Sequence, residues 1–177
     1  MAYDKQKYDH AKAPERPDKP KRVRKARPKA VVFCNGGCTE VGICKTGCVG
    51  CGTCATVCRK GAIVVSPAGF ARVNQDLCIG CGLCARECPQ QVIKLIEPRF
   101  NITARCSNES PGVAVRQICA TGCIGCGQCE KACPAGAIRV TNNHPEINYD
   151  LCIACGMCAV KCPRGVIHDA YGIVAEK

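Results

Sequence analysis

The chain has 177 residues, with 21 Cys, no Trp, 3 Phe and 4 Tyr. A hydrophobic core built from so few large side chains is marginal unless disulfides or bound metal add stability. The formal net charge is +11, and no apolar run approaches the ~20 residues that a membrane-spanning helix needs.

The basic charge is concentrated at the start of the chain. Residues 1–29 contain 11 Lys and Arg but only 4 Asp and Glu, together with Pro14, Pro17, Pro20 and Pro28. Such a segment cannot bury enough apolar surface to fold alone. We therefore predict that residues 1–29 are a basic, Pro-rich tail, extended or ordered by a partner.

An internal repeat follows the tail. Residues 46–65 recur at 121–140 with 12 of 20 positions identical, and residues 74–93 recur at 148–167 with 13 of 20 identical. A repeat at a fixed offset indicates a duplicated structural unit. The repeat predicts two domains, residues 30–98 and 99–177.

Only short secondary-structure elements are predicted within these domains. One helical turn is expected after the third Cys of a repeat unit, as at Ala55–Val57 and Glu130–Ala132. The β-prone runs are Val31–Phe33, Ile63–Val65, Val92–Ile96, Ile102–Thr103, Ala137–Val140 and Val166–Ile167. The pattern predicts small α+β units in which loops hold metal.

Sixteen cysteines form four runs with the spacing C-x2-C-x2-C-x3-C, and Pro follows the last Cys in three of them. This is the run of bacterial ferredoxins, in which the fourth Cys ligates the other [4Fe–4S] cluster of a pair. It predicts an α+β fold of two tandem bacterial-ferredoxin-like (βαβ)2 domains, each binding two [4Fe–4S] clusters.

Four cysteine sets follow from this rule, each with three ligands from one run and one from its partner run. The first site takes Cys48, Cys51, Cys54 and Cys88. The second site takes Cys78, Cys81, Cys84 and Cys58. The third site takes Cys123, Cys126, Cys129 and Cys162, and the fourth takes Cys152, Cys155, Cys158 and Cys133.

Residues between the ligands have expected roles of their own. A glycine follows the second Cys of every run, at Gly52, Gly82, Gly127 and Gly156. Because glycine has no Cβ, we expect these positions to adopt positive φ and to bring backbone close to the cofactor. Val49, Ile79, Ile124 and Ile153 are expected to shield the clusters from water.

The first run departs from the other three at one position. Arg59 stands where the other runs have Pro. Since Cys58 belongs to the second site, Arg59 or Lys60 is expected to raise the reduction potential there. The alternative is a turn substitution without functional effect.

Two other interpretations of the cysteines are weaker. A disulfide framework is typical of small secreted chains, but residues 1–29 contain no apolar signal segment and the Cys count is odd. Structural zinc uses separated C-x2-C pairs or Cys with His. Here the pairs overlap into triplets, and His10, His144 and His168 lie outside the runs, where we expect surface positions.

Five cysteines lie outside the runs: Cys34, Cys38, Cys44, Cys106 and Cys119. Cys34 and Cys106 each end a β-prone run, and Cys44 and Cys119 each precede a run by four residues. One interpretation is that they are small buried hydrophobic residues. The other is that some of them form a fifth metal site.

From about Lys29 onward the chain resembles the C-terminal ferredoxin region of the B subunit of Rnf, the ion-translocating ferredoxin:NAD oxidoreductase. The resemblance lies in Ala30–Gly37 (AVVFCNGG), Cys106–Ser107 and Cys119–Cys126 (CATGCIGC). It implies transfer of low-potential electrons between ferredoxin and a flavin-containing partner. That family carries a membrane anchor and a further cluster domain before this region, where this chain has a hydrophilic tail, so we expect a soluble polyferredoxin subunit.

The function expected from the sequence is therefore electron transfer without substrate chemistry. We expect a cytoplasmic subunit that is not an enzyme on its own and that relays electrons to or from larger flavin- or metal-containing oxidoreductase subunits. Two alternatives are a free diffusible ferredoxin and a nucleic-acid-binding iron–sulfur protein that uses the basic tail on phosphate. Few aromatic residues in the tail disfavour nucleic acid.

Overall fold

The structure is a computed structural model that describes residues 26–170; the predicted tail therefore lies almost wholly outside the described residues. The N-terminal half contains β1 (Lys29–Val32), α1 (Thr53–Thr56), β2 (Ile63–Val65), β3 (Ala71–Val73), α2 (Leu83–Arg86) and β4 (Ile93–Ile96). The C-terminal half contains β5 (Ile102–Ala104), α3 (Gly112–Ile118), α4 (Gln128–Lys131), β6 (Ile138–Thr141), β7 (His144–Ile147), α5 (Met157–Val160) and β8 (Ile167–Asp169).

The two halves share one topology. In each, the first and last strands form an antiparallel pair, with Val32 opposite Ile93 in β1–β4 and Ala104 opposite Ile167 in β5–β8. The middle strands form the hairpins β2–β3 and β6–β7. This arrangement of small sheets with few helices is an α+β ferredoxin-like fold.

Four of the helices are single turns that begin in the same way. Each follows a glycine in the left-handed region, Gly52, Gly82, Gly127 or Gly156, with φ between 70° and 79°. Since the turn starts directly after this glycine, α1 and α4 begin two residues earlier than predicted. The helix then carries the third Cys of each run into the interior, where Cys54, Cys84, Cys129 and Cys158 are buried.

The hydrophobic cores are small and include cysteines. In the N-terminal half, Ala30, Val32, Ile63 and Ile93 pack with Cys54, Cys78 and Cys84. In the C-terminal half, Ile102, Ile138 and Ile167 pack with Cys129 and Cys158. The apolar residues thus form a thin layer behind the cysteine loops, and a core this small is marginal on its own.

Three elements were missed in the sequence: β3, β7 and α3. The hairpin β6–β7 turns through Asn142 and Asn143, whose φ values are 47° and 62°. Two consecutive positive φ angles are typical of a two-residue hairpin turn, which Asn favours. The Asn-Asn pair was therefore a usable signal, whereas α3 has no counterpart among the described residues of the N-terminal half.

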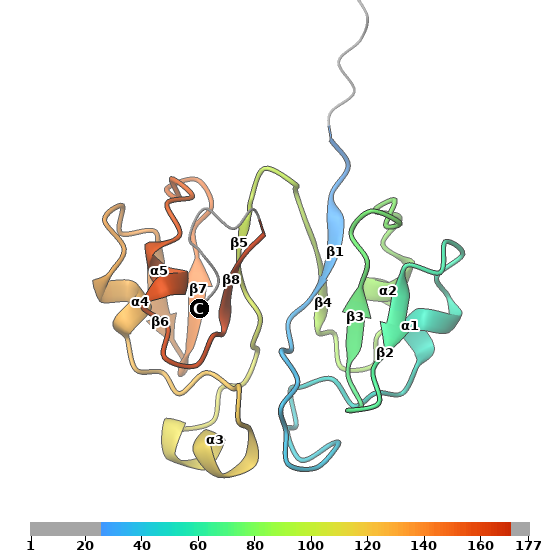
Figure 1. Cartoon of the computed structure of the whole chain (residues 1–177), viewed down its shortest axis with the longest axis horizontal. Helices are drawn as coiled ribbons and strands as arrows, with labels where there is room; N and C mark the ends of the chain where they lie inside the picture. Colours follow the sequence, from blue (N-terminus) through green and yellow to red (C-terminus); the bar gives the residue numbers. More distant parts are fainter. Residues whose placement is uncertain (1–25, 171–177) are drawn as a thin grey trace, which may run out of the picture.

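The two halves stand side by side, with β1–β4 and β5–β8 on their inner sides and the single-turn helices farther out (Figure 1). Two segments, residues 33–47 and residues 105–122 with α3, lie at the lower edge of this view and make backbone contacts between the halves. There, the Ala120 N–H donates to the carbonyl of Gly37 at 2.7 Å, and the Thr39 N–H to that of Ile118 at 3.0 Å. Within residues 26–170, none of the helices has the length and hydropathy needed to cross a membrane.

Candidate metal centres

The cysteines assigned to the first site line one cavity. Cys48, Cys51 and Cys54 come from the loop before α1 and from α1 itself, and Cys88 comes from the end of the second run. The remaining wall is apolar, with Val32, Val65 and Ile93 from three strands. An apolar wall behind four thiols is a setting in which a metal–sulfur cluster is kept from water.

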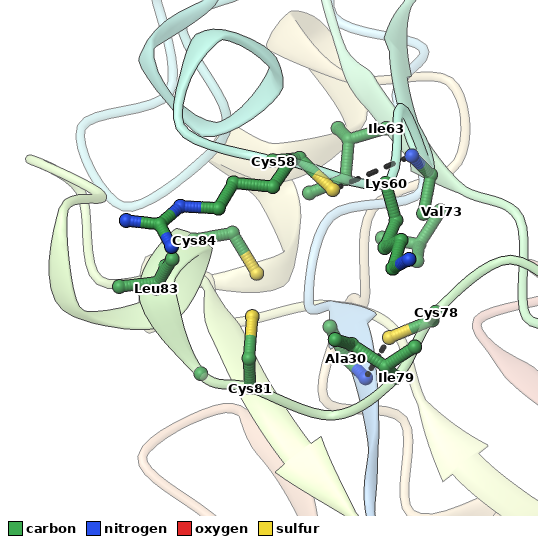
Figure 2. Close-up of a pocket in the computed structure, with 13 residues that line it drawn as sticks. Ala30, Cys58, Lys60, Ile63, Val73, Cys78, Ile79, Cys81, Leu83 and Cys84 are labelled. Atoms are coloured by element: carbon green, nitrogen blue, oxygen red, sulfur yellow. Dashed lines mark hydrogen bonds between the residues drawn. The ribbon is translucent and has the colours of Figure 1, made fainter.

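The cysteines of the second site line a larger cavity of about 150 Å³. The thiols of Cys58, Cys78, Cys81 and Cys84 point toward one another across it (Figure 2). Three come from the second run and Cys58 comes from the first. The close contact of α1 with α2 brings the two runs together.

The C-terminal half repeats this arrangement in full at the third site and in part at the fourth. The cysteines of the third site, Cys123, Cys126, Cys129 and Cys162, line a cavity beside β6 and β8. At the fourth site, Cys133 and Cys152 lie close enough to Cys158 to act on it electrostatically. The packing of α4 against α5 joins these two runs, as α1 and α2 do in the N-terminal half.

Backbone N–H groups are directed at several of these sulfurs. The donors come from the loops and strands behind the cavities and were not predictable from residue type. The contacts are Ala62 to Cys58 (3.3 Å), Ala71 to Cys48 (3.4 Å), Ala30 to Cys78 (3.5 Å), Ala137 to Cys133 (3.2 Å) and Val166 to Cys162 (3.4 Å). N–H···S bonds stabilise negative charge on a cluster and so tune its potential.

Burial dominates the acidity of five cysteine thiols, four of which are carried by the helices. It raises the pKa of Cys54, Cys84, Cys123 and Cys129, and it raises the pKa of Cys158 to about 12. By contrast, hydrogen bonds from the hydroxyl and backbone N–H of Thr53 lower the pKa of Cys51. Because ligating thiols are deprotonated, metal binding here has to displace protons from buried sulfur.

The residues between the ligands are only partly placed as expected. A Cβ built on Gly52 or Gly127 would meet no described atom within 4 Å. Glycine at these two positions is therefore explained by their positive φ and not by lack of space for a side chain. Val49, Ile79 and Ile124 line the first, second and third cavities, respectively. Ile153 is 66% exposed, so it is a poor shield for the fourth site.

Cationic side chains border the second site. Arg59 and Lys60 both line its cavity, and Lys60 is drawn beside the thiols in Figure 2. Lys29 also lies close, since its Nζ donates to the carbonyl of Cys78 at 2.5 Å. Positive charge next to a metal–thiolate site favours its reduced, more negative state.

The donor sets fit an iron–sulfur cluster better than a single ion. Among residues 26–170, no three His, Cys, Asp or Glu side chains are close enough together to hold one metal ion. The thiols nevertheless converge on shared cavities, and thiolate is the ligand of [4Fe–4S] clusters. Wide spacing is expected when several iron atoms have to lie between the sulfurs.

Three family models, each describing a 4Fe-4S dicluster domain, match the chain. They cover residues 41–95, 122–167 and 77–138. The first two each contain the two runs of one half. The third spans the second and third runs, which the structure places in different halves. The chain is therefore an iron–sulfur protein with ferredoxin-type [4Fe–4S] domains, a class that serves electron transport.

No curated protein matches the sequence. Among solved structures, the chain resembles a chain of the formate dehydrogenase–heterodisulfide reductase–formylmethanofuran dehydrogenase complex from Methanospirillum hungatei, with 21% identity and a TM-score of 0.24. The match covers 69% of this chain and 51% of that one, so the chain spans about half the length of its match. The two do not superpose as wholes, and no functional inference follows from this similarity.

His168 differs from its predicted surface position. It is half-buried on β8, where its Nε2 lies 3.0 Å from the Oδ1 of Asn35 in the opposite half. Burial, followed by the charges of Arg105 and Arg72, lowers the pKa of His168 to about 4. It belongs to the contact between the halves and lines none of the first three cavities.

Proposed function

We propose that the chain is an electron-transfer polyferredoxin subunit with four [4Fe–4S] clusters in two tandem domains, residues 30–98 and 99–177. The observation that carries this proposal is the convergence of thiols from two different runs on one cavity, as with Cys58 and the second run. The ligands are the sixteen cysteines of the first to fourth sites. When bound, each cluster would accept and release one electron.

The protein residues would hold these centres and set their potentials. The cross-supplied ligands Cys58 and Cys88 tie the two runs of the N-terminal half together, as Cys133 and Cys162 do in the other half. Backbone N–H groups stabilise the charged sulfurs. Gly52, Gly82, Gly127 and Gly156 let the chain turn from the ligand loop into the helix.

Apolar side chains remain exposed beside the second and fourth sites. Leu77 and Ile79 are 50% and 42% exposed, and their repeat counterparts Leu151 and Ile153 are 53% and 66% exposed. Apolar residues in such positions are typical of surfaces that dock partners. These exposed side chains support docking of larger flavin- or metal-containing oxidoreductase subunits, in line with the resemblance to the Rnf B subunit. We place this role in the cytoplasm.

Reversible reduction of the intact holoprotein tests the electron-transfer role. Anaerobic titration with dithionite should bleach the visible absorption with at least four one-electron equivalents per chain. After removal of excess dithionite, addition of oxidised FMN, which accepts two electrons in one-electron steps, should restore the absorption of the protein and reduce the flavin. Failure to take up electrons, or loss of iron on reduction, would contradict the proposal.

Anaerobic affinity capture of the full chain tests the partner. We expect co-purification with a flavin- or metal-containing subunit, and weaker capture after deletion of residues 1–29 with cluster content unchanged. A chain that stays monomeric would indicate a diffusible ferredoxin. Retention of nucleic acid that depends on residues 1–29 would instead favour a nucleic-acid-binding role.

A further inference from the structure

All five cysteines outside the four runs line one cavity at the contact between the halves. They are Cys34, Cys38, Cys44, Cys106 and Cys119. The cavity has a volume of about 20 Å³, the same as the cavities of the first and third sites. Three of them lie within residues 34–44 and two within residues 106–119, so the docking of the two halves brings the two groups together.

Paired backbone segments build the walls of this cavity. Cys34 lies opposite Cys106 in an isolated antiparallel bridge, and Cys38 lies opposite Cys119 in another. The hydroxyl of Ser107 adds hydrogen bonds to the carbonyls of Phe33 (3.2 Å) and Thr46 (2.7 Å). The cavity is therefore a fixed part of the contact between the halves.

Cys34 and Cys106 have matching surroundings. The backbone N–H of Cys48 donates to the sulfur of Cys34. The backbone N–H of Cys123 donates to the sulfur of Cys106 at 3.4 Å. Cys48 and Cys123 are the first ligands of the first and third sites, so the cavity lies directly next to one site of each half.

Cys44 and Cys119 form a second matching pair. The sulfur of each lies 3.8 Å from the hydroxyl of the Thr two residues later. A glycine follows each Thr. A Cβ added to Gly47 would lie only 3.1 Å from the sulfur of Cys44, and one added to Gly122 only 3.2 Å from the sulfur of Cys119. Both halves thus present two thiols in the same way. The paired cysteines are 72 residues apart (Cys34 and Cys106) or 75 residues apart (Cys44 and Cys119). Cys38 has no counterpart, because the residues at these two offsets from it are Ser110 and Val113.

Amide donors face three of the five thiols, those of Cys34, Cys44 and Cys106, whereas the Cys119 thiol donates to the carbonyl of Gly36 at 3.5 Å. Asn108 is buried, and its Nδ2 donates to the sulfur of Cys44 at 3.5 Å. Arg105 also lines the cavity, and its buried Nε has no hydrogen-bond partner among the described residues. Amide donors directed at sulfur stabilise thiolates bound to metal. A single metal ion is disfavoured by the same wide spacing that holds for the four other sites.

We propose that this cavity binds a fifth [4Fe–4S] cluster, ligated by Cys34, Cys44, Cys106 and Cys119 and shared equally between the two halves. Cys38 is not a ligand. Because the site adjoins the first and third sites through Cys48 and Cys123, it forms the connection between the cluster pairs of the two halves. The proposal concerns metal content and holds whether or not the chain works as a relay subunit.

Anaerobic native mass spectrometry of the reconstituted full chain counts clusters per molecule. The fully loaded wild type should carry five clusters, about 20 iron atoms. The Cys44→Ala/Cys119→Ala variant should stop at four clusters, about 16 iron atoms. The matched control Cys38→Ala should still carry five.

Other outcomes would overturn the proposal. A wild type that never exceeds four clusters, with the five thiols free to alkylation after unfolding, would show them to be buried hydrophobic residues. A Cys38–Cys119 disulfide found by peptide mapping would show a structural cross-link instead. Loss of the fifth cluster in Cys38→Ala would refute the ligand set. If the double variant does not fold, the wild-type count alone still decides whether the fifth cluster exists.

Discussion

His168 in one half donates a hydrogen bond through Nε2 to the Oδ1 of Asn35 in the other, at 3.0 Å. The Asn35 Nδ2 in turn donates to the carbonyl of Gly165 at 3.3 Å, which orients the amide. This pair spans the contact that also contains the five additional cysteines. Burial, and then the charges of Arg105 and Arg72, lower the pKa of His168 in this contact.

The first prediction is that stability falls as pH decreases from about 6.5 toward 4. The pKa of His168 is about 4 in the folded chain, below its ordinary value of 6.5. Between these values the unfolded chain binds a proton that the folded chain excludes, so stability is fully present above pH 6.5 and is lost as pH falls. Denaturant midpoints of the holoprotein between pH 5 and 7.5 measure this slope.

His168→Gln should flatten that pH dependence, because Gln can keep the hydrogen bond to Asn35 but does not titrate. His144→Gln, which changes a histidine of the β6–β7 hairpin, is the matched control for loss of an imidazole elsewhere in the chain. Equal slopes for wild type and His168→Gln would refute the prediction.

The second prediction concerns the potential of the second site. Arg59 and Lys60 line that cavity, so the double variant Arg59→Pro/Lys60→Gln should lower one of the measured potentials. For exposed charges, an interaction of about 0.5–1 kcal/mol corresponds to about 20–40 mV for a one-electron couple. Potentiometric titration followed by EPR measures the shift.

The control for this variant is Arg139→Gln, which removes a cation of β6 that lines none of the first three cavities. It should leave every potential unchanged. If the double variant also leaves all potentials unchanged, Arg59 is a turn substitution without an electrostatic role.

The third prediction compares two glycines of the N-terminal half. Gly80 and Gly61 both have positive φ, 71° and 59°, but a Cβ on Gly80 would lie 1.9 Å from the carbonyl oxygen of Pro28, whereas one on Gly61 would meet open space. Gly61→Ala should cost about 1–2 kcal/mol of unfolding free energy from φ alone. Gly80→Ala should cost about 1–3 kcal/mol more because backbone has to move.

Denaturant unfolding of both variants, with iron content measured in parallel, checks this difference. Gly80→Ala should also lose iron, because Pro28 directly precedes β1 and Ala30 of β1 donates to the sulfur of Cys78. Equal stability of the two variants would show that the approach of Pro28 to Gly80 does not matter.

The fourth prediction uses Ala154, which has a φ of 57° where the other three runs have glycine at φ of 64° to 71°. A left-handed Ala is strained by about 1–2 kcal/mol, and glycine adds about 0.4–1 kcal/mol of entropy to the unfolded chain. Ala154→Gly should therefore stabilise the fold by about 0.5–1 kcal/mol. Ala159→Gly, within helix α5, should instead destabilise it by about 1 kcal/mol.

The same denaturant series measures both alanine variants. A destabilising Ala154→Gly would mean that the methyl group of Ala154 makes packing contacts worth more than the strain.

The fifth prediction tests whether the fourth Cys of a run ligates the cluster of its own run or the cluster of the partner run. Cys58 and Cys78 belong to different runs but to the same site, so Cys58→Ala/Cys78→Ala should lose about four iron atoms, no more than either single variant. Cys58 and Cys48 belong to one run but to different sites, so Cys58→Ala/Cys48→Ala should lose about eight. Iron and sulfide analysis of the anaerobic protein gives the counts, and the reverse order would refute cross-ligation.

The local chemistry of the chain could be predicted from the sequence. The spacing within each run, the glycine after its second Cys and the offset between repeats are local properties, and they predicted small strands, single helical turns and a positive φ at Gly52. The strand β3 and the helix α3 could not be predicted, because three-residue strands and a single seven-residue helix depend on their partners for stability. His168 was assigned to the surface because nothing in the sequence shows that Asn35 packs against it.

The sequence by itself determined that this is a [4Fe–4S] protein, since thiol ligands at this spacing on a short loop suit an iron–sulfur cluster and little else. Only the tertiary structure decided what the five additional cysteines have in common. Cys34 and Cys106 are separated by 72 residues, and their meeting depends on how the two halves dock. Docking arises from many weak contacts spread over both loops, and no local pattern in the sequence encodes it.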